Sequence, residues 1–197
     1  MEGQREFPAY PSSLQCLSQY LLLRALPMKN LLIAILLGLA GPAFAQSPEA
    51  KLAQLGLTLP TVAPAIGSYV DVVRVGNLLF LSGKGPRQSS GAYITGRLGA
   101  DLTTAQGYEA ARLTALLQLA VLKKELGDLG KVRRIVKVNG YVKSADTFTE
   151  QPQVINGYSD LLIQVFGERG RHARTALGTN ALPLGMALEV EMVVEVE

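Results

Sequence analysis

Apolar residues recur along the second half of the chain with the two periods that distinguish strands from helices. Between residues 187 and 196 nearly every second side chain is apolar, and Glu189 and Glu191 lie between them, which predicts a strand with one buried face. Between residues 148 and 166 apolar side chains recur at steps of three and four, which predicts an amphipathic helix. The alternation therefore places Glu189 on the face of the last strand that points away from the helices.

The other predicted elements are marked by turn and cap residues. Thr103 and Gln106 have capping-box spacing, and Gly127 ends the Ala- and Leu-rich segment that follows, so a second, deeply buried helix is expected over 103–126. Gly76 and Asn77 tolerate the backbone of a tight hairpin turn. The further predicted strands are 69–74, 78–82, 93–98, 132–142, which Asn139-Gly140 is expected to break, and 174–177.

This order of elements, ββ(β)αβαββ, predicts an α/β (α+β) sandwich with a mixed six-stranded sheet and two helices on one face. Two helices cover only one side of such a sheet. We therefore expect the other face to meet further subunits, with any site on that face lying at an interface.

The N-terminal region has the three parts of a secretory signal. Residues 28–45 read as a basic start, an apolar stretch too short to span a bilayer, and small residues before a cleavage point after Ala45. Residues 1–27 precede the signal and are interpreted as a doubtful extension. We expect a periplasmic or secreted protein without a stable membrane anchor, a hypothesis that the N-terminal sequence of the expressed protein tests. The mature chain then consists of a lead-in, 46–63, and a domain, 64–197.

Composition narrows the chemistry of that mature chain. Cys16 is the single cysteine and lies in the extension, so no thiol or disulfide is expected. One histidine and no clustered carboxylates at ligand spacing make a metal site improbable. Removing three basic and two acidic residues with the leader leaves 16 basic and 14 acidic residues, a net charge of +2. So small a charge, without interleaved aromatics, argues against nucleic-acid binding.

Arg174 is the strongest candidate for binding chemistry. Its planar guanidinium fits a carboxylate with two parallel hydrogen bonds, so a fixed arginine near a carboxylate such as Glu189 suggests a site for small acids. Spacing alone leaves a surface salt bridge as the alternative.

An ordered set of short motifs adds specificity. It resembles the RidA (formerly YjgF) family, the endoribonuclease L-PSP/chorismate mutase-like domain of reactive-imine deaminases, over roughly residues 64–197. The motifs are Ile66-Gly67-Ser68-Tyr69-Val70, Val75-Gly76-Asn77-Leu78, Leu81-Ser82-Gly83, Arg174-Thr175-Ala176-Leu177, Leu182-Pro183 and Leu188-Glu189-Val190-Glu191.

The resemblance implies a homotrimer with pockets between subunits, and hydrolysis of small 2-imino or enamine acids to 2-oxo acids and ammonia without a cofactor. It implies that Arg174 clamps the substrate carboxylate and that Glu189 serves the hydrolytic water. It also implies substrate-binding roles for Tyr69, Ser82, Gly83 and Asn156.

The chain departs from the family pattern near these positions. His172 stands in place of the usual proline, Thr175 stands where Ser or Cys is commoner, and Lys84 stands where many members have Gln. A non-catalytic trimer that binds small carboxylates therefore stays open beside the enzyme. Ribonuclease activity, a label attached to relatives, is disfavoured because the chain has no paired histidines for acid-base work.

Overall fold

The computed structural model describes residues 46–65 and 67–197. The predicted signal sequence, 28–45, and the extension, 1–27, lie outside the described residues, so export and cleavage after Ala45 stay predictions. Among the described residues, no helix is both long enough and apolar enough to cross a membrane.

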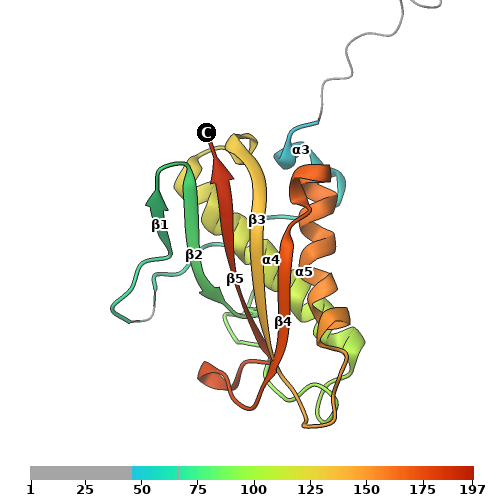
Figure 1. Cartoon of the computed structure of the whole chain (residues 1–197). Coiled ribbons are helices and arrows are strands. Elements are labelled where there is room, and N and C mark those ends of the chain that lie inside the picture. The colour runs from blue at the N-terminus through green and yellow to red at the C-terminus, as the bar shows by residue number, and fades with distance from the viewer. Residues whose placement is uncertain (1–45, 66) are drawn as a thin grey trace, which may run out of the picture. The chain divides into compact units, whose positions relative to one another are not determined.

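The described part of the chain forms a five-stranded sheet covered by two long helices, and apart from the expected strand 93–98 these elements follow the predicted order (Figure 1). Short 3₁₀ turns, η2 to η4, connect some of these elements. The bounds are α3 Pro48–Gln54, β1 Val72–Val75, β2 Leu78–Lys84, α4 Thr104–Leu126, η2 Leu129–Lys131, β3 Val132–Lys143, α5 Gln151–Phe166, η3 Gly167–Gly170, β4 Ala173–Thr179, η4 Pro183–Gly185 and β5 Leu188–Val196.

The sheet is mixed, as predicted, with the strand order β1-β2-β5-β3-β4. Its neighbours pair antiparallel except for β3 and β4, which are parallel and are joined by α5. Parallel neighbours need a crossover connection, and a helix is the usual one. Helices α4 and α5 pack side by side against the same face, so one face of the sheet stays uncovered by helices (Figure 1).

The last strand shows the predicted alternation. Leu188, Val190, Met192 and their alternate neighbours are buried against the helices, whereas Glu189 and Glu191 are half-buried on the other face. On helix α4, the expected capping box is present, because the Thr103 side chain accepts from the Gln106 amide and the Gln106 side chain accepts from the Thr103 amide. Both features confirm the sequence prediction.

Two glycines let the helices and the sheet approach closely. A side chain at Gly157 would collide with the backbone carbonyl of Tyr108, so α5 and α4 touch at that point. A side chain at Gly140 would lie 2.6 Å from a methyl carbon of Ile155 on α5. Strand β3 therefore runs unbroken through Asn139-Gly140, and the prediction of a break there is wrong: the glycine makes room for the helix.

The prediction of six strands is also wrong. Residues 93–98 make only isolated bridges, such as Thr95 with Met186 and Leu98 with Ser144, and do not join the sheet as a strand. Gly96 has a φ of 122°, which interrupts the extended backbone that a continuous ladder requires.

The lead-in is packed as part of the same compact unit as the rest of the described chain. Ser47 caps helix α3, and Leu52 is only 3% exposed within the core. The Glu49 carboxylate accepts from the Lys123 ammonium at 2.7 Å and from the Leu129 amide at 2.8 Å. These contacts fix the segment that precedes β1, which the sequence left without a role.

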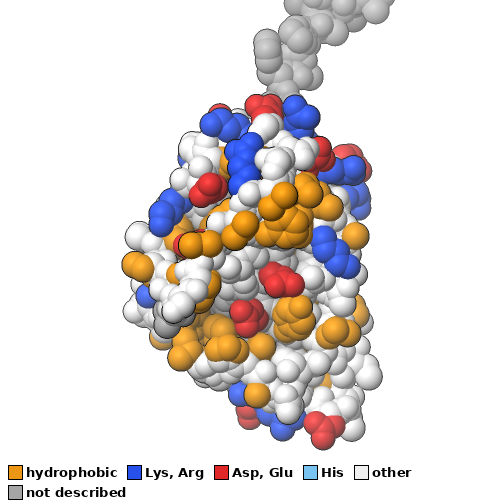
Figure 2. All heavy atoms as spheres, turned by 60° about the vertical axis from the view of Figure 1, so that its left-hand side comes forward, with side chains coloured by type: hydrophobic (Ala, Val, Ile, Leu, Met, Phe, Trp, Pro, Cys, Tyr) orange, Lys and Arg blue, Asp and Glu red, His pale blue; other side chains and the backbone are white. Residues whose placement is uncertain are grey.

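The helix-free face of the sheet carries exposed apolar side chains. Val73, Phe80 and Leu177 are 51%, 44% and 54% exposed, and their strand partners place them on the same face as Val193 and Glu189. Figure 2 shows hydrophobic side chains bordering a hollowed region that contains acidic ones. Exposed apolar groups of this kind are typical of protein contact surfaces.

Candidate functional site

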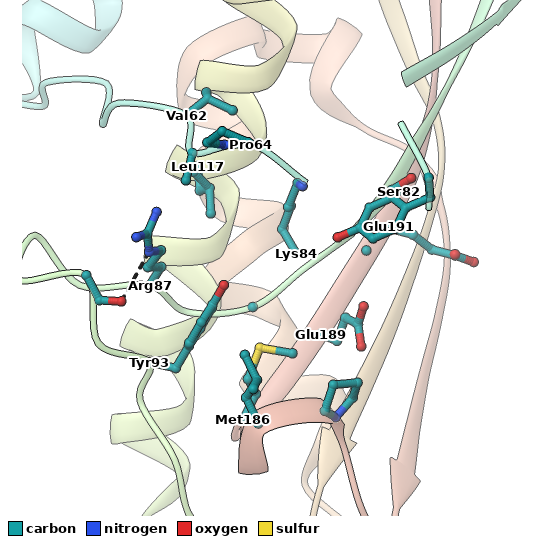
Figure 3. A pocket seen from close by; sticks show the side chains of 17 residues that line it. Val62, Pro64, Ser82, Lys84, Arg87, Tyr93, Leu117, Met186, Glu189 and Glu191 are labelled. Atoms are coloured by element: carbon teal, nitrogen blue, oxygen red, sulfur yellow. Dashed lines mark hydrogen bonds between the residues drawn. The ribbon is translucent and has the colours of Figure 1, made fainter. Parts of the chain in front are cut away.

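A hollow of about 730 Å³ lies between strand β5, which carries Glu189 and Glu191, and helix α4, which carries Leu117 (Figure 3). Strand β2 with the loop that follows it, the 183–186 turn and the lead-in complete its walls. Its polar lining side chains are Tyr69, Ser82, Lys84, Arg87, Tyr93, Glu189 and Glu191, and its apolar ones include Val62, Pro64, Leu117 and Met186.

Glu189 is the carboxylate of this hollow that the protein leaves free. None of the described residues donates a hydrogen bond to its side chain. Burial raises the pKa of Glu189 first, the neighbouring Glu191 raises it further, and Lys84 partly opposes the shift. A side chain at Gly83 would lie 2.8 Å from the Glu189 carboxyl carbon, so the glycine provides the space that this carboxylate occupies. A free carboxylate with a raised pKa is a stronger base than an ordinary glutamate and is suited to accept a proton.

Glu191 lies two residues after Glu189, on the same face of β5, and its side chain is fixed by hydrogen bonds. Its Oε1 accepts from the Asn139 side-chain amide at 3.0 Å and from the Tyr141 hydroxyl at 3.3 Å. Burial raises the pKa of Tyr141, and the charges of Glu191 and Glu189 add to that effect. Glu189 and Glu191 thus differ in their hydrogen bonding. Glu191 is fixed by neighbours on β3, whereas Glu189 is available to a ligand.

At the rim of the hollow, Lys84 contacts two neighbouring side chains, Asp71 and Tyr69. Its ammonium forms an ion pair with Asp71 at 2.5 Å and lies 5.8 Å from the centre of the Tyr69 ring. The Ser82 hydroxyl donates to the Val70 carbonyl at 2.7 Å. The Lys84 ammonium therefore lies beside the Tyr69 ring, within the range of a cation–π contact, where both residues line the hollow.

Arg174 lies on the opposite face of the sheet. Its partner on β3 is Val138, whose side chain is buried under the helices, whereas the partner of Glu189 is Tyr141 on the open face. Within one chain, the structure therefore does not bring Arg174 next to Glu189. Alternation along each strand separates the two side chains.

The Arg174 guanidinium is held by neutral oxygens of α5. It donates to Asn156 Oδ1 at 2.9 Å, to Ser159 Oγ at 3.0 Å and to the Pro152 carbonyl at 3.3 Å. No described carboxylate lies within 4.0 Å of it, so the surface salt bridge is not what the structure shows. Burial lowers the pKa of Arg174 and Asp160 opposes the shift, yet a guanidinium keeps its charge. The helix fixes this cation without neutralising it.

His172 continues the hydrogen-bond chain that begins at Arg174 and passes through Ser159. Its Nδ1 lies 2.7 Å from the Gly170 carbonyl, which can only accept, so Nδ1 carries the proton. Its Nε2 then accepts from the Ser159 hydroxyl at 3.0 Å, and Ser159 Oγ accepts from Arg174. Burial lowers the pKa of His172, the Gly170 carbonyl opposes the shift, and the charge of Arg174 adds to it. The neutral imidazole thus orients the hydroxyl that holds Arg174.

The lowered pKa of His172 predicts a stability change on mild acidification. Below its ordinary pKa of 6.5 the unfolded chain binds a proton that the folded chain does not, so stability falls as the pH drops from 6.5 towards the folded pKa. We expect the melting temperature of the wild type to fall more between pH 7 and pH 5 than that of His172→Gln, whose amide does not titrate. Because the chain has one histidine, parallel melting curves for the two proteins would contradict this assignment.

The six predicted site residues fall into two groups. Tyr69, Ser82, Gly83 and Glu189 meet in the hollow, while Arg174 and Asn156 meet each other behind the sheet.

Sequence reasoning missed Arg87, Tyr93 and the lead-in residues that line the hollow. They lie in loops without a periodic pattern. The described residues also contain no cluster of three or more side chains suited to hold a metal ion.

The fold and the hollow define an α/β protein with a cavity of small-ligand size beside a free carboxylate, and the fixed arginine lies on the opposite face of the sheet. A family model described as "YjgF/chorismate mutase-like, putative endoribonuclease" matches residues 49–196. The chain belongs to this YjgF (RidA) family, which confirms the resemblance. Its members are typically oligomers that bind small molecules, and a small-molecule-processing role in general follows.

Individual relatives agree with this assignment. Protein TCP17 of Trypanosoma cruzi is 47% identical over 147 residues, which cover 74% of this chain and 92% of that protein. The solved structure of Atu1372 from Agrobacterium tumefaciens, of unknown function, is 43% identical with a TM-score of 0.70, covering 76% of this chain and 91% of that one. A Shewanella oneidensis protein that carries the same endoribonuclease description is 38% identical with a TM-score of 0.73, covering 77% and 100%.

Proposed function

We propose that the protein hydrolyses small 2-imino or enamine acids to 2-oxo acids and ammonia, in a pocket shared by neighbouring subunits of a homotrimer. The observation that carries the proposal is the free, half-buried carboxylate of Glu189, whose pKa is raised and which lines a hollow of ligand size. Burial of a carboxylate without hydrogen-bond donors is costly, and a water or substrate group offers it a partner.

A second subunit is needed to complete the site. Within one chain, Arg174 and Glu189 lie on opposite faces of the sheet, so a substrate that touches both must lie between two copies. The exposed Val73, Phe80 and Leu177 side chains on the open face supply apolar surface for such a contact. In a closed ring of three copies, each Glu189 would meet the Arg174 edge of its neighbour.

The proposed reaction is an addition followed by an elimination. The guanidinium of Arg174 binds the substrate carboxylate with two hydrogen bonds and fixes the imine carbon over the hollow. Glu189 accepts a proton from water while the water oxygen bonds to that carbon, and the C=N electron pair moves to the nitrogen, which takes a proton from solvent. The carboxyl of Glu189 then gives its proton to the amine. The C–N bond breaks as ammonia leaves, and the hydroxyl loses its proton to solvent to give the 2-oxo acid. The residues suffice for these steps because such imines already react with water.

Glu189→Gln tests this role. Its amide keeps the shape of the side chain but accepts no proton, so we expect the acceleration of 2-iminopropanoate decay to fall roughly 10²- to 10⁴-fold. The imine is generated from alanine by an amino-acid oxidase, and its decay is followed by trapping the remainder. Glu191→Gln is the matched control on the same strand and face, and we expect it to keep most of the activity.

Equal rates for wild type and Glu189→Gln would refute the proposed role of this carboxylate. A wild type that leaves the decay unchanged, yet is stabilised against heat by small carboxylates, would instead support a non-catalytic binding protein.

A further inference from the structure

The hollow contains a second arginine, Arg87, whose position the loop after β2 fixes. Arg87 and Tyr93 form an isolated antiparallel bridge, and the Arg87 Nε donates to the Gly91 carbonyl at 3.1 Å. Gly91 has a φ of 90°, a conformation that glycine adopts readily and that turns the loop back on itself. In Figure 3 the guanidinium lies at the side of the hollow near Tyr93 and Leu117, apart from Glu189 on β5.

The carboxylates of the described residues leave the charge of Arg87 unpaired. Lys84 is paired with Asp71, and Glu191 is engaged by Asn139 and Tyr141. No carboxylate among the described residues lies within 4.0 Å of the Arg87 guanidinium. A half-buried arginine with only its Nε bonded keeps its terminal N–H groups for an acceptor that the ligand supplies.

The surroundings of Arg87 define what that ligand group is. Leu117, Pro64 and Met186 give the hollow apolar walls, which suit a short methylene chain. Glu189 and Glu191 repel an anion from the β5 side, so a carboxylate in the hollow is drawn to the side that holds Arg87. A planar guanidinium selects a carboxylate over a single hydroxyl because it can donate two parallel hydrogen bonds.

We propose that the hollow takes a substrate with a second acidic group, an imino acid whose side chain ends in a carboxylate held by Arg87. The inference rests on the proposed function for the imine, but the class of ligand is defined by the hollow itself. Arg174 of the neighbouring subunit binds the carboxylate beside the imine carbon, and Arg87 binds the distal one. The two arginines would thus fix both ends of the ligand, with Glu189 facing its reactive carbon.

The test compares two product-like acids that differ in one group, 2-oxoglutarate and 2-oxopentanoate, by calorimetric titration. We expect the wild type to bind the dicarboxylate roughly ten- to hundredfold more tightly, the range for a hydrogen-bonded charge. Arg87→Gln should remove this preference while still binding 2-oxopentanoate. Arg112→Gln is the matched control, because Arg112 bonds to Gln164 outside the hollow, and it should keep the preference.

Equal binding of the two acids by the wild type would overturn the inference, as would a preference that survives in Arg87→Gln. Equal weakening of both acids in Arg87→Gln would also overturn it, because the arginine would then act on the loop and not on the distal group. Decay of 2-iminopropanoate with the wild type is followed in parallel. If the wild type does not accelerate that decay, the proposed reaction is wrong. If the wild type accelerates the decay but binds the two acids equally, only the proposed class of ligand is wrong.

Discussion

Arg174→Ala should abolish most of the acceleration of 2-iminopropanoate hydrolysis. The guanidinium is fixed by Asn156, Ser159 and the Pro152 carbonyl, and no described carboxylate neutralises it. Removing a charge-assisted bidentate contact costs about 2–4 kcal/mol, which corresponds to a roughly 30- to 1,000-fold loss in kcat/KM. The measurement is the dependence of the decay rate on enzyme and imine concentration.

Arg171→Ala is the matched control for this loss. Arg171 belongs to the same segment but is exposed and paired with Glu168 at 3.0 Å, so its removal should leave the rate nearly unchanged. If Arg174→Ala were as active as this control, the arginine would have no part in the site.

Mixing the two inactive variants separates a shared pocket from one formed within a chain. If each site takes Glu189 from one subunit and Arg174 from the next, randomly mixed trimers of Glu189→Gln and Arg174→Ala regain roughly a quarter of the sites. Refolding the variants together and then measuring imine decay provides the readout. No recovery in verified mixed oligomers would show that the proposed partnership across the subunit boundary is wrong.

The elements that the sequence predicts well are those with local physical causes. The alternation on β5 depends on burying one face, and the capping box at Thr103 satisfies amide groups that the first turn of α4 leaves free. The hairpin at Gly76 follows from a φ of 61°, which glycine accepts without strain. The expected strand 93–98 does not form because Gly96 interrupts the extended backbone. Its residues also alternate less clearly between apolar and polar than those of β5.

The candidate site is harder to predict because its geometry depends on pairing between distant strands. The chain order places Arg174 and Glu189 fifteen residues apart, but the face of each is set by its register with β3, at Val138 and Tyr141 respectively. Arg87 could not be found from periodicity, because it lines the hollow from a loop whose shape depends on Gly91. Residue types suggested candidate groups, and only the fold shows which of these groups meet.

The close contact between α4 and α5 predicts the largest loss of stability. A methyl group at Gly157 would lie 2.8 Å from the carbonyl carbon of Tyr108 and closer still to its oxygen. Helix backbones cannot yield as side chains do, so α5 must shift. Alanine favours the helix by about 1 kcal/mol, but the collision costs more, and we expect Gly157→Ala to lower the free energy of unfolding by about 2–3 kcal/mol.

Gly107→Ala in α4 distinguishes this collision from a general effect of alanine in a helix. Its methyl group would meet side-chain carbons, Leu98 Cδ1 at 2.6 Å and Val154 Cγ2 at 2.9 Å, which can rotate away. We expect a loss of about 1 kcal/mol or less, measured by urea unfolding at matched protein concentration. Because Asn156 precedes Gly157 and bonds to Arg174, a shifted α5 should also weaken binding of small carboxylates. A Gly157→Ala protein as stable as the Gly107→Ala control would show that the two helices do not touch here.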